Sequence, residues 1–155
     1  MNYWWLNANP SEQMWKVYTS PTGDDELKDG ASSVPEFLFS PKPTEWLSGY
    51  FSRANHSEVA DGDIVICYKT AAVQKIVAIG QIRHVHRKDG KVKGCYIEVI
   101  KKIQNPTISK DALANDYPDL NINSKSFAPA TMYKLPSNTG LSLIGIICIK
   151  EIRND

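Results

Sequence analysis

The chain opens on a short apolar segment that ends abruptly. Tyr3, Trp4, Trp5 and Leu6 are followed by Asn7-Ala8-Asn9-Pro10. Aromatic side chains favour a pleated, half-buried surface, and short amides before a proline mark a turn. We expect a strand that ends at Asn7, either as the polar floor of a ligand pocket or as an ordinary core strand before a turn. Because successive side chains of a strand alternate, Trp4 and Trp5 should point to opposite faces.

Two segments of the first third have a helical pattern. Ser11 can cap a short helical turn that includes Trp15. Thr44 can cap a second helix, and four apolar residues after it have helical spacing, namely Trp46, Leu47, Tyr50 and Phe51. The segment between them contains glycine, proline and acidic residues, which predicts an exposed loop over 19–33 and a short apolar segment over 35–39.

The middle of the chain alternates apolar runs with glycine turns. Asp61-Gly62-Asp63 predicts a tight turn into a strand over 64–68. Two further strands are expected over 76–85 and 92–103, joined by a turn at Lys88-Asp89-Gly90-Lys91. Asp-Gly between two β-branched runs is a strong hairpin signal.

The last third is less regular. Ser109 is expected to cap a short helix over 110–115, and a strand is predicted over 132–135. The segment 141–152 is ambiguous, because its isoleucines favour a strand whereas Leu141, Ile144, Cys148 and Ile152 fit one helical face. The total predicts an α+β fold of five to six mostly antiparallel strands, flanked by two or three short helices inserted early. A strongly bent sheet or partly closed barrel fits this order best.

Composition narrows the class of protein. A length of 155 residues, 42% hydrophobic and 23% charged, fits one globular domain over 1–155. No apolar run approaches the roughly 20 residues of a membrane span, and no secretory signal is visible. The cysteines are odd in number and lie far apart, at Cys67, Cys95 and Cys148. This favours reduced thiols in a cytoplasmic protein without a cysteine metal site.

Charge is balanced overall but uneven locally. The formal net charge is +1, so no global field attracts polyanions. Basic residues gather around His84 and His86 in the predicted hairpin, and Arg83, Arg87, Lys88 and Lys91 are the candidates for phosphate contacts. The alternative is a solvated hairpin tip with no ligand.

Patterns typical of catalysis are missing. The sequence has no glycine-rich phosphate loop, no Walker pattern, no His-Glu-x-x-His and no nucleophile elbow. None of the three histidines forms part of a recognisable nucleophile–base or metal-ligand pattern. The sequence therefore favours binding over catalysis, with no cofactor and no metal.

Four segments in one order resemble a known family. They are Tyr3-Trp4-Trp5-Leu6-Asn7, Phe39-Ser40-Pro41-Lys42, Val59-Ala60-Asp61-Gly62-Asp63-Ile64-Val65 and Ile76-Val77-Ala78-Ile79-Gly80-Gln81-Ile82. This order resembles the EVE domain of the PUA-like superfamily, whose relatives include the YTH and ASCH domains. The resemblance extends over about residues 1–135.

The resemblance implies a PUA-like bent β-barrel whose pocket takes a base flipped out of a nucleic acid, in many relatives a modified cytosine of DNA. It implies that Asn7 makes hydrogen bonds to the base edge. It also implies a cage of Phe39, Ser40 and Pro41 opposite Tyr68 and Lys69, with Trp15 and Trp46 as further candidates. Phe39 stands where relatives often have tryptophan, which reduces the stacking area.

Three alternatives stay open. The same fold binds RNA in some relatives, because pocket shape alone does not decide whether a 2′-hydroxyl is recognised. A small ASCH-like amidohydrolase acting on acylated nucleosides would use Lys69 with an acid such as Glu45 or Asp63. A stand-alone binding subunit would act through a separate effector protein.

Overall fold

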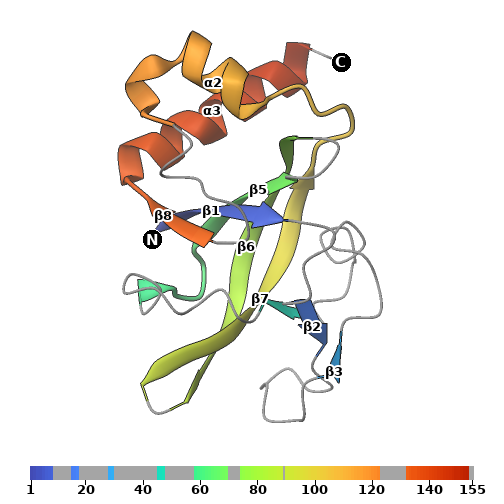
Figure 1. Ribbon diagram of the computed structural model, residues 1–155, viewed down its shortest axis with the longest axis vertical. Helices are drawn as coiled ribbons and strands as arrows, with labels where there is room; N and C mark the ends of the chain where they lie inside the picture. Colours follow the sequence, from blue (N-terminus) through green and yellow to red (C-terminus); the bar gives the residue numbers. More distant parts are fainter. Residues whose placement is uncertain are drawn as a thin grey trace.

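The computed structural model describes residues 1–8, 15–17, 28–29, 45–47, 58–69, 74–88, 90–122 and 132–153. They form an α+β fold with one sheet and two α-helices (Figure 1). The strands of the described residues are β1 (Tyr3–Ala8), β2 (Trp15–Val17), β3 (Lys28–Asp29), β4 (Glu45–Leu47), β5 (Ile64–Lys69), β6 (Lys75–Lys88), β7 (Lys91–Lys102) and β8 (Met132–Leu135). The helices are α2 (Lys110–Asp116), the 3₁₀ helix η2 (Pro118–Leu120) and α3 (Ser137–Arg153).

The strands follow the order β3-β2-β4-β7-β6-β5-β1-β8. Only the β1–β5 pair is parallel among the pairs formed by the described strands, with Tyr3 opposite Ile64 and Asn7 opposite Tyr68. The expectation of a mostly antiparallel sheet is thus confirmed. Because β3 and β8 are the two ends of this order and are not paired with each other, the described strands do not close into the expected barrel.

The predicted hairpin is the longest feature of the sheet. β6 and β7 pair from Ala78–Lys102 to Lys88–Lys91, and Gly90 has the positive φ of +75° that the turn requires. Three register shifts interrupt the pairing, and such bulges bend a ribbon and increase its twist. The ribbon curves, and its tip extends away from the two helices (Figure 1).

Both helices predicted in the first third are wrong where the structure describes them. Trp15–Val17 and Glu45–Leu47 are short strands, and β4 pairs with β7 through Trp46 and Tyr96 while β2 pairs with β4. Pairing along the free edge of β7 overrides the local helical spacing, as tertiary context often does for short segments. Together with β3, these strands raise the count to eight, above the five or six expected.

The helices of the described residues lie late in the chain. Ser109 caps α2 as predicted, because its Oγ accepts a hydrogen bond from the N–H of Ala112 at 3.0 Å. The ambiguous segment is the helix α3, which has 17 residues and is therefore not short. Its buried face comprises Leu143, Ile146 and Ile147, whereas Leu141 and Cys148 of the expected apolar face are exposed.

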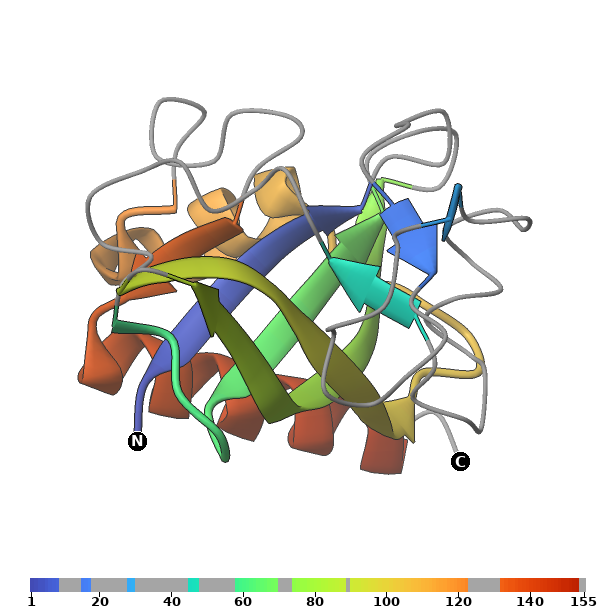
Figure 2. The ribbon, with the colours of Figure 1, turned by 90° about the horizontal axis from the view of Figure 1, so that it is seen from below.

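The sheet has a hydrophobic core on each face. Trp4 belongs to one cluster with Leu6, Val65 and Ile82, and Trp5 belongs to the other. The second cluster contains residues of both helices, and Figure 2 shows α3 running along that face of the sheet. The two tryptophans thus point to opposite faces, as strand alternation predicts. No helix in the described part of the chain is long and apolar enough to cross a membrane.

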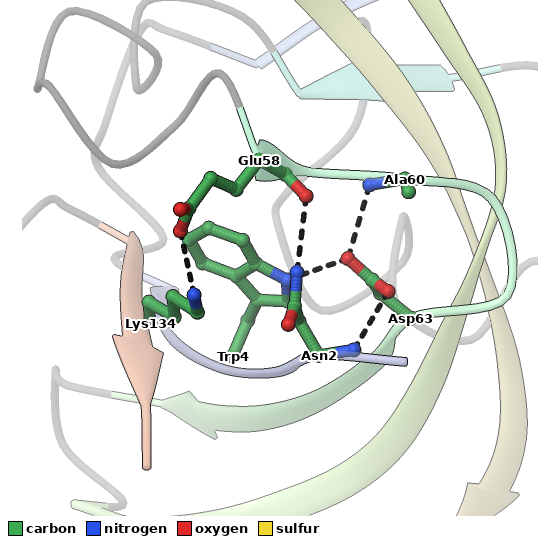
Figure 3. A network of polar contacts seen from close by, with 6 residues as sticks. All are labelled: Asn2, Trp4, Glu58, Ala60, Asp63 and Lys134. Carbon is green, nitrogen blue, oxygen red and sulfur yellow. Dashed lines mark hydrogen bonds and ion pairs between the residues drawn. The ribbon is translucent and has the colours of Figure 1, made fainter. Parts of the chain in front are cut away.

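A buried carboxylate joins the start of β1 to the turn before β5. Asp63 accepts hydrogen bonds from the backbone N–H groups of Asn2 and Ala60 and from the indole N–H of Trp4, at 2.9, 3.0 and 2.9 Å (Figure 3). The Nδ2 of Asn2 donates to the carbonyl oxygen of Glu58, whose carboxylate pairs with Lys134 of β8 at 2.6 Å. This network fixes the first residues of the chain against two other segments.

Candidate functional site

The parallel pairing of β1 and β5 brings the ends of both strands to one edge of the sheet. Asn7 and Tyr68 are direct neighbours there. The first turn of α2 packs against the same place, with the Nζ of Lys110 at 5.0 Å from the ring centroid of Tyr68 and 5.9 Å from that of Trp5. We call Trp5, Asn7, Tyr68 and Lys110 the β1–β5 end cluster.

Hydrogen bonds and ring contacts hold this cluster in one arrangement. The indole N–H of Trp5 donates to the Oδ1 of Asn7 at 2.9 Å, and the hydroxyl of Tyr68 donates to the carbonyl oxygen of Gln74 at 2.7 Å. The two rings lie 5.1 Å apart with a tilt of 31°, within the range of favourable aromatic pairs. The cluster therefore presents fixed polar groups beside two aromatic rings.

Burial shapes the electrostatics of the cluster. Desolvation lowers the pKa of the half-buried Lys110, while the two rings attract its ammonium form. Desolvation also raises the pKa of Tyr68, and the charge of Asp111 adds to this shift. The backbone N–H of Lys110 beside the phenol oxygen acts in the opposite direction. The ammonium group of Lys110, which is partly exposed, is the member of the cluster that can attract a ligand from solvent.

The structure brings together only part of the predicted pocket. Asn7, Trp5 and Tyr68 are buried, and Lys69 and Lys110 are partly exposed at the edge. Phe39, Ser40 and Pro41 lie outside the described residues. Trp15 and Trp46 lie on β2 and β4, which β7 and β6 separate from β5 in the strand order, and their side chains also lie outside what the structure describes.

The predicted phosphate contacts lie on the β6–β7 ribbon. Arg83 pairs with Glu98 across the two strands, and Arg87 donates to the carbonyl oxygen of Val59. Both arginines are exposed. The backbones of Lys88 and Lys91 pair with each other at the tip, and their side chains lie outside the described part of the chain. The tip thus gathers three basic positions, while the charge of Arg83 is balanced by an acid.

Two of the residues named for hydrolysis, Asp63 and Lys69, do not meet. Asp63 directly precedes β5 and Lys69 ends it, so about 20 Å of strand separates them at roughly 3.3 Å per residue. Glu45 lies on β4, and its side chain is outside the described set. Burial raises the pKa of Cys67 to about 12, which makes this thiol a poor nucleophile. Among the side chains that the structure describes, no three His, Cys, Asp or Glu residues are grouped to hold a metal ion.

Sequence reasoning missed Lys110, and it left open which of Trp4 and Trp5 faces the pocket. Lys110 reaches the cluster only because α2 packs against the sheet, a contact between positions more than 40 residues apart. The signal in the sequence that could have identified Lys110 was Ser109. This serine caps α2, so Lys110 is the first residue of the helix.

Comparisons with known proteins support the fold. No family model matches the chain, and no curated protein matches it. The solution structure of Rpa0253 from Rhodopseudomonas palustris is similar, with 15% identity, a TM-score of 0.60 and coverage of 95% of this chain and 92% of that chain. The crystal structure of Atu2648 from Agrobacterium tumefaciens has 16% identity, a TM-score of 0.54 and coverage of 95% and 93%. At these identities the likeness concerns the fold alone.

Proposed function

We propose that this protein is a non-catalytic nucleic-acid-binding module that recognises a modified base, with a modified cytosine in DNA as the first candidate. The observation that carries the proposal is the β1–β5 end cluster. There, two aromatic rings, an amide and an ammonium group meet at one edge of the sheet. The proposal includes membership of the PUA-like EVE domains, which rests on the four ordered segments of the sequence.

The chemistry of a flipped base matches this combination of groups. An extruded base offers two π-faces and a polar edge, and proteins bind it with aromatic walls and a few hydrogen-bonding groups. Tyr68 and Lys110 are the members nearest to solvent, since Tyr68 is 5% exposed and Lys110 is partly exposed. Phe39, Ser40 and Pro41 would complete the cage from outside the described residues.

The β6–β7 ribbon supplies the second element of the proposal. Contacts to phosphates position a protein on a duplex without specifying sequence. With a net charge of only +1, the protein relies on local cations, and the tip carries Arg87, Lys88 and Lys91. Binding through these residues should be moderate and sensitive to salt.

Binding to matched oligonucleotides tests the function. The panel contains duplexes with cytosine, 5-methylcytosine, 5-hydroxymethylcytosine or N6-methyladenine, together with RNA counterparts, each at two salt concentrations. We expect one modified base to be preferred at both concentrations. Uniform, weak binding that disappears with salt would contradict a base pocket, and a preference for the RNA series would identify RNA as the target.

Two variants separate the pocket from the ribbon. Lys110→Met keeps the aliphatic stem over the rings but removes the charge, so it should reduce the preference for the modified base. Lys88→Ala should weaken all sequences alike and reduce the salt slope by about 1. Lys101→Ala is the matched control, because Lys101 lies near the other end of β7 and pairs with Glu151. It should leave both quantities unchanged.

A further inference from the structure

A cavity lies beside β8 and the start of α3, the helix that directly follows β8 in the chain. The label β8 is on the left of Figure 1. Its volume is about 350 Å³, within the size range of small-molecule sites. Among the described residues it is lined by Leu120, Asn121, Tyr133, Lys134, Leu135, Pro136 and Thr139. β8 pairs here with the first residues of β1, through Leu135 and Tyr3.

Among the lining residues, Thr139 indicates that the cavity binds a ligand. Its side chain is buried, with the residue only 8% exposed, and its hydroxyl has no hydrogen-bond partner among the described residues. A buried hydroxyl without a partner costs free energy, and native proteins contain few of them. A ligand atom in the cavity would satisfy this group.

The same wall contains the start of a long helix. α3 has 17 residues, begins directly after Pro136 and has no acidic residue in its first turn. The N–H of Gly140 makes the first bond, to the carbonyl oxygen of Pro136 at 3.0 Å, so the N–H groups of the preceding residues have no partner within the helix. Pro136 stands at the capping position of α3, and its side chain cannot accept a hydrogen bond from these N–H groups. Helix starts of this kind bind phosphate groups.

The other lining residues indicate the charge and the shape of the ligand. No acid is found among the described residues that line the cavity. The side chain of Lys134 points to the other face of the sheet, where the carboxylate of Glu58 holds its Nζ at 2.6 Å. Leu120, Leu135 and the ring of Tyr133 provide apolar surface for a flat or aliphatic body.

We infer that this cavity is a binding site for a small organic phosphate, with the phosphate at the start of α3 and the body against Tyr133 and Leu120. The phosphate accepts hydrogen bonds from the Thr139 hydroxyl and from the first N–H groups of the helix. The inference does not depend on the proposed base recognition, because none of the described residues that line the cavity belongs to the β1–β5 end cluster.

Amide chemical shifts in an NMR titration test the site directly. Cytidine 5′-monophosphate is the probe, and cytidine and inorganic phosphate separate the contributions of body and phosphate. We expect the nucleotide to shift the amides of residues 137–140 and to bind more tightly than either fragment. A dinucleotide with a 5′-phosphate distinguishes a strand end from a free nucleotide as the source. Absence of shifts at 137–140, or equal binding of cytidine, would overturn the inference.

Variants at the cavity distinguish ligand binding from a structural role. Thr139→Val replaces the hydroxyl by a methyl group of the same shape, so it should weaken nucleotide binding about tenfold, as loss of a hydrogen bond to a charged group does. Its stability should be unchanged or higher. Glu58→Gln should leave nucleotide binding unchanged, because the pair of Glu58 and Lys134 lies on the other face of the sheet. Thr107→Val, at an exposed threonine elsewhere, is the control. Full affinity in Thr139→Val would contradict the assignment.

Discussion

Asp63 can serve its three donors only as a carboxylate. Its oxygens accept from two backbone N–H groups and an indole N–H, and the residue is only 2% exposed. Asp63→Asn would turn an NH₂ group toward at least one of these donors. We expect a loss of roughly 1–3 kcal/mol in the free energy of unfolding, the cost of leaving a buried polar group unpaired. Urea unfolding followed by tryptophan fluorescence measures it.

The control for this prediction lies in the same turn. Asp61 is exposed, so Asp61→Asn should change the unfolding free energy by less than about 0.5 kcal/mol. Equal stability of the two variants would show that the Asp63 network adds nothing to the fold.

At the level of single residues, the sequence identifies those site residues whose positions follow from strand alternation and strand ends. Asn7 and Tyr68 could be named because each ends an apolar strand, and these strands prove to be neighbours. Lys110 could not, since its contact with Tyr68 requires the position of α2 on the sheet. Nor does the sequence reveal that the amide oxygen of Asn7 already accepts a hydrogen bond from Trp5.

Substitution of two glycines of α3 by alanine should have opposite effects on the stability of the protein. A Cβ on Gly140 would lie 2.2 Å from the ring of Tyr3, whereas a Cβ on Gly145 would meet nothing within 4 Å. Gly140→Ala should therefore push α3 away from β1 and destabilise the protein. Gly145→Ala should stabilise it by up to about 1 kcal/mol, the difference in helix propensity. Thermal unfolding of both variants decides this, and a stabilised Gly140→Ala variant would exclude the close packing of α3 on β1.

Elements could be predicted where their signals are local. The β6–β7 hairpin follows from the Asp-Gly turn between two β-branched runs, and α2 follows from its capping serine. β2 and β4 have three residues each and exist through pairing with other strands, so helical spacing was misleading there. In α3 the apolar residues are too numerous to reveal which of them face the core, and Leu143 rather than Leu141 does so.

The topology of the whole molecule could be predicted only between strands adjacent in sequence. The antiparallel steps from β5 to β6 and from β6 to β7 were expected. The parallel pairing of β1 with β5 joins segments about 60 residues apart and has no local signal. This pairing creates the edge where the proposed base site lies, so the site geometry could not be predicted from the sequence.

Both cores share one sheet, and β6 contributes to each of them. Val77 and Ala78 both face the first cluster, at the register shift opposite Cys67 and Tyr68. On a regular strand, residues six positions apart face the same side. This bulge reverses the alternation, so Ile76 and Ile82 lie in different clusters. Because the strand that carries both residues is continuous, unfolding of one face should unfold the other.

Ile76→Ala and Ile82→Ala test this coupling. Both side chains are fully buried, so each variant should lose about 2–5 kcal/mol of unfolding free energy. Each should shift a single transition that far-UV circular dichroism and tryptophan fluorescence report at the same urea concentration. Ile100→Ala, at a position 47% exposed, is the control and should shift the midpoint far less. Separate transitions for the two probes, with each variant moving only one of them, would mean that the faces of the sheet fold independently.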